Sequence, residues 1–407
     1  MRLLTIGVFA RAARLSPKAL RLYDELGLLT PARVDPSSGY RLYDPAQLER
    51  ARLVAWLRRL GMPLARIRAV CDAGPGAAAA EVRAYWAQFE SDTAARRDLV
   101  AFLIDHLSGK DTTTMTSATT TAGTRPGFAI RYAAASDTGT VRERNEDTAY
   151  AGPRLLAVAD GFGGAAASAT TASATAASAS DTAAPSAGVS ATPAADTAGT
   201  SGVTASAVAI EALRALETDD APLGNLLNSL EEAAHRANNS VGELAASDPA
   251  LHGMGTTLTA LLWSGSRLAL VHIGDSRAYL LRDGRFFQIT HDHTLVRAMI
   301  DEGRITAEEA ASHPQRALLL RALGGGGEFA PDLGVREVRA GDRYLLCSDG
   351  LSAVVGAEDI RDVVASAPAP GDAVRELIDL AVRAGGPDNV SCVVADVVED
   401  VVEPREP

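Results

Sequence analysis

The sequence predicts a multidomain protein with a helical N-terminal domain, a long helix, and an α+β domain of antiparallel sheets covered by helices. Residues 1–74 contain short helix patterns separated by Gly and Pro signals. Residues 128–400 contain apolar strand patterns joined by hairpin turns, with helical patterns set apart from them. This order favours antiparallel sheets over a doubly wound parallel sheet. Residues 108–127 are mostly Thr, Ser, Ala and Gly, a composition typical of a flexible linker.

The overall composition is that of a soluble globular protein, with 47% hydrophobic and 22% charged residues. No apolar run reaches the roughly 18–20 residues that a membrane helix needs, and the N-terminus lacks a signal-peptide pattern. We therefore expect a cytoplasmic protein with no membrane partner. The three cysteines, Cys71, Cys347 and Cys392, are far apart in the sequence, which argues against a disulfide framework or a thiolate zinc site.

Charge is distributed unevenly along the chain. Residues 1–70 contain 13 Lys and Arg against 5 Asp and Glu, which gives them a net charge of +8. Because the whole chain carries −12, the remaining residues carry −20. A basic N-terminal domain on an acidic body indicates that only the N-terminal domain meets a polyanion.

The first helices of the chain have clear boundary signals. Ser16 and Pro17 supply an N-cap and a first-turn proline for a helix that ends at Gly27. This helix follows another short one across a tight turn, which is typical of a helix-turn-helix unit. A hairpin is predicted around 36–39, and a further helix over 44–60.

This region resembles the DNA-binding domain of MerR-family regulators. The resemblance rests on ALRLYDELGLLTPAR and GYRLY, which follow the family's helix-turn-helix and wing patterns. It implies binding to a palindromic promoter site, with the second helix in the major groove and most contacts made to phosphate. By position, the recognition helix carries Lys18, Arg21 and Tyr23, and the wing carries Arg33, Tyr40 and Arg41. An isolated basic helix would instead be simply solvated, but the full winged pattern favours DNA binding.

Residues 75–107 form a predicted long helix with an interrupted apolar stripe. The stripe consists of Val82, Tyr85, Trp86, Phe89, Leu99, Phe102, Leu103 and Leu107. MerR-family proteins use a helix at this position to form an antiparallel coiled-coil dimer, so the resemblance implies a dimerisation helix and a homodimer, which also suits a palindromic site. The alternative is that the stripe packs on its own domain.

Four aspartates in the C-terminal region stand where an apolar, strand-like run meets a Gly or Asn. They are Asp160 in LLAVADGFGG, Asp275 in LVHIGDSRA, Asp349 in YLLCSDGLS and Asp388 in GGPDNVS. A buried strand that ends in a carboxylate beside a glycine can deliver a hard oxygen ligand to one point. A single such end would be an ordinary turn. Four of them suggest convergence on Mg²⁺ or Mn²⁺.

This region, 128–400, closely resembles the bacterial branch of the type 2C metal-dependent protein serine/threonine phosphatases. The matching blocks come in the family order: SDTGTVRERNEDTAY, LLAVADGFGG, GMGTTLTALL, VHIGDSRAYLLRDG, DRYLLCSDGLS and GGPDNVSCVVADV. The resemblance implies a four-layer α+β sandwich of two antiparallel sheets flanked by helices. It also implies hydrolysis of phosphoserine and phosphothreonine proteins. We expect this hydrolysis to be direct, without a phosphoenzyme, because no Cys or Ser nucleophile with a base partner is apparent in the sequence.

The resemblance further implies residue roles around two Mn²⁺ or Mg²⁺ ions. Asp160 would bridge both ions, and the Gly161 carbonyl would bind one of them. Asp349 and Asp388 would complete the ligand shell of the other ion. Asp275 would bind a third, weaker ion. Arg142 would clamp the substrate phosphate through its guanidinium fork. Glu146 and Asp147 would orient water from outside the ligand shell. His272 lies in an apolar strand and is expected in the core, whereas His291 and His293 are expected in an exposed loop.

Three features depart from the family pattern. Residues 165–200 are almost entirely Ala, Ser and Thr, which predicts a disordered insertion that either leaves the site intact or loosens the preceding glycine turn. Ala317 stands where some members have a hydroxyl near the third metal, and Phe162 where some have His. Two functions therefore stay open: a phosphatase tethered to a DNA-binding regulator, or a regulator whose phosphatase-like domain is a non-catalytic sensor or binding module.

Overall fold

The computed structural model describes residues 3–107, 127–163, 204–217, 226–324 and 329–400. The predicted insertion over 165–200 lies outside these residues, as does the predicted linker apart from its last residue. The chain forms two compact units: Met1–Ser91 with His293–Leu319, and Asp92–Asp292 with Leu320–Pro407. No helix in the described ranges is long and apolar enough to cross a membrane.

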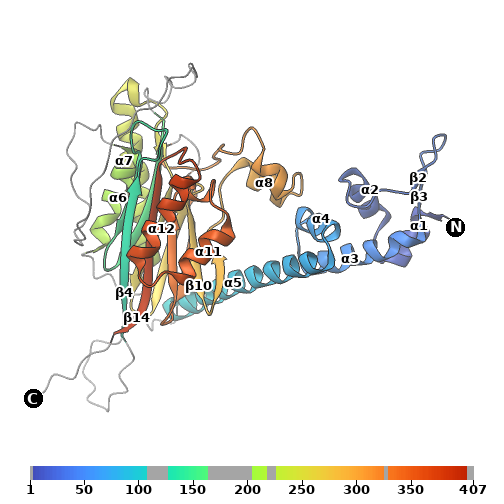
Figure 1. Ribbon diagram of the computed structural model, residues 1–407, viewed down its shortest axis with the longest axis horizontal. Helices are drawn as coiled ribbons and strands as arrows, with labels where there is room; N and C mark the ends of the chain where they lie inside the picture. Colours follow the sequence, from blue (N-terminus) through green and yellow to red (C-terminus); the bar gives the residue numbers. More distant parts are fainter. Residues whose placement is uncertain (1–2, 108–126, 164–203, 218–225, 325–328, 401–407) are drawn as a thin grey trace, which may run out of the picture. The chain divides into compact units, whose positions relative to one another are not determined.

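The first unit contains the predicted helix-turn-helix and hairpin (Figure 1). Its elements are β1 (Leu4–Thr5), α1 (Ile6–Ala13), α2 (Pro17–Glu25), β2 (Arg33–Val34), β3 (Arg41–Tyr43), η1 (Pro45–Gln47), α3 (Leu48–Arg59), α4 (Leu64–Asp72), the start of α5 (Pro75–Leu107), α8 (Leu295–Asp301) and α9 (Ala307–Ala311). The Ser16 hydroxyl accepts a hydrogen bond from the Ala19 N–H at 3.0 Å, so the predicted N-cap is confirmed. The predicted wing is the β2–β3 hairpin, to which β1 adds a third strand.

Apolar side chains from α1, α2, α3, α4 and α5 share one core. Phe9, Leu20, Leu57 and Ile67 are fully or almost fully buried in it. The Phe9 ring stacks on Tyr43 with 4.5 Å between centroids, which joins α1 to the wing. Each such side chain contributes about 1.5–3 kcal/mol by leaving water, so the core accounts for a stable winged domain.

Some side chains of the apolar stripe of α5 pack on other parts of the chain, and others are exposed. Val82 and Tyr85 pack on the winged core. Further along, Phe102 is only 4% exposed and lies under the guanidinium of Arg267 at 5.5 Å, and Asp98 accepts a hydrogen bond from the Glu337 N–H at 3.1 Å. The stripe residues that stay exposed are Trp86, Phe89, Leu103 and Leu107, joined by Val100 and Ile104. Part of the stripe therefore packs on its own chain, and part is left on the surface.

The second unit is built from two antiparallel sheets. The first has the order β11 (Arg285–Gln288), β10 (Arg277–Arg282), β13 (Arg343–Cys347), β14 (Val390–Asp400) and β4 (Gly127–Asp137). The second has the order β12 (Asp332–Glu337), β9 (Arg267–Ile273), β8 (Leu258–Ser264), β6 (Leu155–Phe162) and β5 (Asp147–Ala151), and β7 (Gly255–Thr256) pairs with β6. Every strand pair is antiparallel, as the hairpin signals predict.

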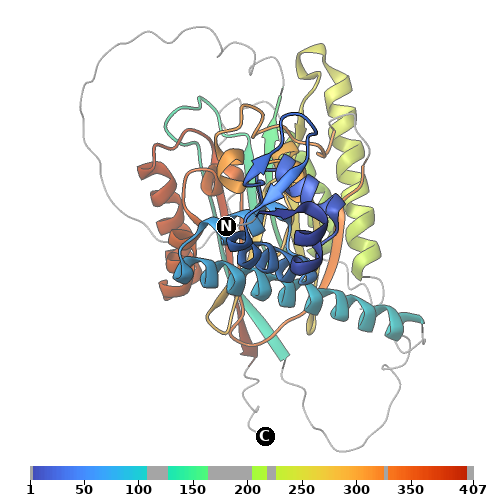
Figure 2. The same ribbon diagram turned by 90° about the vertical axis from the view of Figure 1, so that its right-hand side faces the viewer.

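Helices cover the outer face of each sheet, which gives four layers (Figures 1 and 2). The β6–β8–β9 face carries α6 (Ala205–Arg214), η4 (Ala215–Glu217) and α7 (Leu226–Ser247), with η6 (Pro249–Leu251) following α7. The other sheet carries α10 (Asp349–Ser352), α11 (Ala357–Ser366) and α12 (Pro370–Arg383). The predicted fold class is confirmed.

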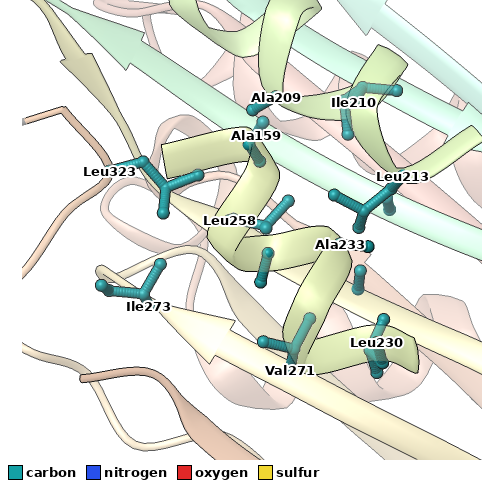
Figure 3. Packing of buried hydrophobic residues seen from close by; sticks show 14 of the residues in the cluster. Ala159, Ala209, Ile210, Leu213, Leu230, Ala233, Leu258, Val271, Ile273 and Leu323 are labelled. Atoms are coloured by element: carbon teal, nitrogen blue, oxygen red, sulfur yellow. The ribbon is translucent and has the colours of Figure 1, made fainter. Parts of the chain in front are cut away.

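The alternation of side chains along β6 determines where its aspartate lies. Ala159 lies beside Ala209 in the buried cluster that also contains Leu213 and Leu230, beneath α6 and α7 (Figure 3). Because successive strand residues point to opposite faces, Asp160 points away from this helix-covered core, towards the other sheet. The fold therefore places a carboxylate between the sheets at the end of a buried strand.

Candidate functional site

Two aspartates meet directly across a strand pair. Asp147 opens β5 and is the register partner of Asp160 in β6. Facing residues of antiparallel strands have their Cβ atoms about 4.5–5.5 Å apart on the same face, and like charges there repel. The chain thus forces two carboxyl groups together, with Asp147 only 8% exposed.

Three further aspartates reach the same place from other strand ends. Asp349 follows β13, Asp388 precedes β14, and Asp275 follows β9. The carboxyls of Asp160 and Asp349 lie within hydrogen-bonding reach of each other, and the charges of Asp275 and Asp388 act on this pair. The structure therefore brings together all four predicted strand-end aspartates, from both sheets.

Burial and mutual repulsion shift the protonation of this cluster. Burial, followed by the charges of Asp147, Asp349 and Asp275, raises the pKa of Asp160 well above its ordinary value. Burial is also the main cause that raises the pKa of Asp147 to about 7 and that of Asp275 to about 7. One buried oxygen of Asp147, Oδ2, has no hydrogen-bond partner among the described residues. A divalent cation would supply the positive charge that these oxygens lack.

The donor set fits Mg²⁺ or Mn²⁺ rather than a closed structural metal. Within the described ranges, no three His, Cys, Asp or Glu side chains are arranged to hold an ion by themselves. Mg²⁺ binds through one or two carboxylates and keeps several waters, so it does not require such a cage. Hard carboxylate and carbonyl oxygens also suit Mn²⁺.

Gly161 is required by the close approach of two strands. Its N–H donates to the Glu146 carbonyl at 3.2 Å, and a Cβ at this position would lie 2.6 Å from the same oxygen. The hydroxyl of Thr257 accepts a hydrogen bond from the Asp160 N–H at 3.0 Å and fixes the strand from its other edge. The sequence motif GMGTT contains Thr257, but sequence reasoning assigned it no role.

Arg142 and Glu146 lie at the rim of the cluster. Arg142 Nη2 is 2.7 Å from Asp388 Oδ2, and its side chain is 52% exposed. Burial raises the pKa of Glu146, which lies near Arg142 and Asp388. A half-exposed guanidinium beside the carboxyls is placed to meet an incoming anion.

Asn389 is a residue of the site that sequence reasoning missed. Its Oδ1 accepts from the Glu146 N–H at 2.9 Å, and its Nδ2 donates to the carbonyls of Thr138 at 3.0 Å and Arg144 at 2.9 Å. This side chain therefore holds the segment that carries Arg142, Glu146 and Asp147. Its signal in the sequence is its place directly after Asp388.

The three histidines considered in the sequence differ in burial. His272 is fully buried, with Nδ1 at 2.9 Å from the Thr259 hydroxyl and Nε2 at 3.0 Å from the His291 carbonyl, so the predicted core role is confirmed. The expectation of exposed loop positions is correct for His291 and wrong for His293. The latter is 7% exposed, as is typical of a buried residue, and its neighbour Thr294 is buried too.

The predicted DNA-contacting residues differ in how exposed their side chains are. Lys18 and Arg21 on α2 are exposed, as are Arg33 and Tyr40 on the hairpin. Arg41 is paired with Asp24 at 2.6 Å, so part of its guanidinium is already bound.

The inclusion of Tyr23 among the DNA-contacting residues is corrected by the structure. Its ring is 5% exposed and packs in the winged core, because Tyr23 lies on the same face of α2 as buried Leu20. Tyr23 is therefore a packing residue.

Comparison with known families agrees with this geometry. Residues 143–379 match the family model "Protein phosphatase 2C". The chain belongs to the protein phosphatase 2C family. Residues 4–74 match the model "MerR HTH family regulatory protein", so this phosphatase-family chain also carries a MerR-type helix-turn-helix domain. Both predicted resemblances are confirmed.

Curated relatives are bacterial phosphatases. The chain is 50% identical over 270 residues to the serine/threonine protein phosphatase PstP of Mycobacterium tuberculosis, which covers 66% of this chain and 45% of PstP. It is 38% identical over 156 residues to the protein phosphatase PhpP of Streptococcus pneumoniae, which covers 38% of this chain and 63% of PhpP. The chain thus spans less than half the length of PstP.

Solved structures show the same fold. The crystal structure of PstP from Mycobacterium tuberculosis superposes with a TM-score of 0.55 at 48% identity, covering 67% of this chain and all of that one. The catalytic domain of PstP in complex with two manganese ions gives a TM-score of 0.54, with the same identity and coverage. The phosphatase MsPP from Mycobacterium smegmatis, in complex with cacodylate, gives 0.50 at 36% identity, covering 65% of this chain and 97% of that one.

Proposed function

We propose that this chain is a metal-dependent protein serine/threonine phosphatase tethered to a DNA-binding regulator. The observation that carries the proposal is the cluster of carboxyls from four strand ends, in which burial raises the pKa of Asp160, Asp275 and Asp349, and beside which the buried Oδ2 of Asp147 has no hydrogen-bond partner among the described residues. The likeness to PstP, crystallised with two manganese ions, supports a dinuclear Mn²⁺ or Mg²⁺ centre. The PstP name supports phosphoserine and phosphothreonine proteins as substrates.

The residues of the chain divide the work of phosphate-ester hydrolysis. Asp160, the Gly161 carbonyl, Asp349 and Asp388 would hold two cations, with Asp275 at a weaker third site. When bound, the cations would make a water molecule a stronger nucleophile and would neutralise negative charge on the phosphate. Arg142 would bind the substrate phosphate, since its guanidinium presents parallel N–H donors to an oxyanion.

Neither cysteine near the site is available as an alternative nucleophile. Cys347 and Cys392 are fully buried. Burial raises the pKa of the Cys347 thiol to about 12 and that of Cys392 well above its usual value. Because the thiolate is the reactive form, both thiols are inert at neutral pH. This supports direct attack by water, without a phosphoenzyme.

Hydrolysis of a phosphothreonine peptide with and without Mn²⁺ tests the enzyme proposal. We expect Mn²⁺-dependent turnover that Asp160→Ala and Asp349→Ala each reduce by more than the roughly 10- to 100-fold typical of residues outside a ligand shell. The matched control is Asp379→Ala, which removes an exposed carboxylate on α12. Turnover that both site variants retain would refute the enzyme. A parent protein with no turnover would support the sensor alternative.

We further propose that the winged domain binds a palindromic promoter site as a homodimer. The exposed cations on α2 and on the hairpin support this, as does the MerR match over residues 4–74. The double variant Lys18→Ala with Arg21→Ala should weaken a gel shift and reduce the slope of log affinity against log salt by about 2, one per lost phosphate contact. Arg361→Ala, which removes an arginine on α11 whose side chain is 43% exposed, is the control. Unchanged binding would exclude docking by α2.

A further inference from the structure

The substrate-clamping arginine is bonded to a proposed metal ligand. Arg142 Nη2 donates to Asp388 Oδ2 at 2.7 Å, although 246 positions separate the two residues. The second carboxylate oxygen, Oδ1, accepts from the Asn389 N–H at 2.9 Å. Both oxygens of Asp388 are thus engaged by protein donors, and Oδ2 is the one whose donor sits on a movable side chain.

Hydrogen bonds join the backbone of the Arg142 loop to the loop that carries Asp388. The Thr140 hydroxyl donates to the Gly385 carbonyl at 2.6 Å, and the Thr140 N–H donates to the Gly386 carbonyl at 2.8 Å. Gly139 adopts φ +74°, and a Cβ there would collide with the Asp388 carbonyl, so only glycine permits this approach. These contacts hold the loop beside Asp388, so the simplest way for Arg142 to leave Asp388 is rotation of its side chain.

The surroundings allow that rotation. The Arg142 side chain is 52% exposed, so it can reach solvent without disrupting a core. Glu146 and Asp160 also attract it, which keeps the guanidinium near the cluster after it leaves Asp388. A divalent cation at Asp388 would repel the guanidinium and claim the same oxygen.

We propose that Arg142 is a positioning latch: it competes with a divalent cation for Asp388 Oδ2, and cation binding releases its guanidinium towards the substrate phosphate. The proposal rests on the proposed metal centre and adds an order of events, in which the cation binds before the phosphate clamp is free. By thermodynamic reciprocity, Arg142 must weaken cation binding as much as the cation weakens the Arg142–Asp388 pair. For a half-exposed ion pair, this is about a two- to fivefold effect on cation affinity.

Calorimetric titration with Mn²⁺ alone tests the latch without using activity. We expect Arg142→Gln to bind Mn²⁺ about two- to fivefold more tightly than the parent. Arg144→Gln is the matched control, because it removes a positive charge from the same loop, and no hydrogen bond of its side chain to Asp388 is seen among the described residues. Equal or weaker binding by Arg142→Gln overturns the latch. Equal tightening by both variants also overturns it, because a general charge effect would then suffice.

A second measurement needs no variant. Arginine side-chain NMR of the parent protein, titrated with diamagnetic Mg²⁺, should show hindered rotation of the Arg142 guanidinium that is lost when the ion binds. Rotation that stays hindered would refute release. A parent protein that binds neither Mn²⁺ nor Mg²⁺ would instead refute the proposed metal centre itself, so the two failures are distinguishable.

Discussion

Without metal, the phosphatase domain should lose stability as pH rises through neutrality. Burial and neighbouring carboxylates raise the pKa of Asp147 from 3.8 to about 7 in the folded protein. The folded state therefore keeps a proton that the unfolded state releases. The resulting stability is fully present below about pH 3.8 and is lost as pH rises to about 7. Asp275, with its pKa also raised to about 7, acts in the same direction.

The size of the effect follows from the width of this window. Between pH 5 and the folded pKa of about 7, the two pKa units are worth about 3 kcal/mol for Asp147 alone, at about 1.4 kcal/mol per unit. A typical domain has only about 5–15 kcal/mol of stability, so the loss is readily measured. Mn²⁺ at about 100 times its dissociation constant would restore about 2.7 kcal/mol.

Urea unfolding in the presence of a chelator at pH 5, 6, 7 and 8 measures this loss. Trp263 is 7% exposed, whereas Trp56 and Trp86 are 59% and 43% exposed, so the fluorescence change on unfolding reports mainly on the phosphatase domain. The isosteric control Asp147→Asn cannot ionise, and it should flatten the pH dependence and raise stability at pH 8. If the stability of the parent protein in the presence of chelator were constant or increased with pH, the raised pKa values of these buried carboxyls would be refuted.

Three further predictions concern the fold and assembly. Gly161→Ala should destabilise the domain by about 1–3 kcal/mol and weaken Mn²⁺ binding in calorimetry, because its Cβ would press on the Glu146 carbonyl; unaltered binding would contradict this. Asp342→Ala should lower the free energy of unfolding in urea by about 3–5 kcal/mol, because Arg282 donates to Asp342 at 2.6 and 2.7 Å and would lose this carboxylate partner. Mn²⁺ affinity should stay unchanged. A loss of stability below about 1 kcal/mol would contradict this prediction. Leu103→Glu, on the exposed face of α5, should convert the proposed homodimer to a monomer in light scattering; a variant that stays dimeric would exclude this face.

Local signals in the sequence were sufficient for much of the fold. Ser16 and Pro17 begin a helix because a hydroxyl and a missing N–H satisfy the first turn wherever they occur. The apolar runs before Asp160 and Asp349 predict buried strands by length and composition alone. The exposed positions of Lys18 and Arg21 follow from their place on an amphipathic helix.

The spacing of apolar residues along a helix did not predict which of these side chains are buried. Tyr23 and Phe102 both look available in the sequence, yet one packs in the winged core and the other lies beneath Arg267. The reason is that a stripe shows which face of a helix is apolar, but its partner comes from elsewhere in the chain. The exposed remainder of α5 is therefore visible only in the folded structure.

The sequence by itself determined the two family resemblances, the helices with their caps, and the aspartates at strand ends, because these depend on residues close together in the chain. Only the tertiary structure decided that the carboxyls meet, that Asn389 secures the Arg142 loop, and that Arg142 rests on Asp388. These contacts join residues as many as about 250 positions apart. Their geometry depends on how two whole sheets pack, and no local pattern specifies that packing.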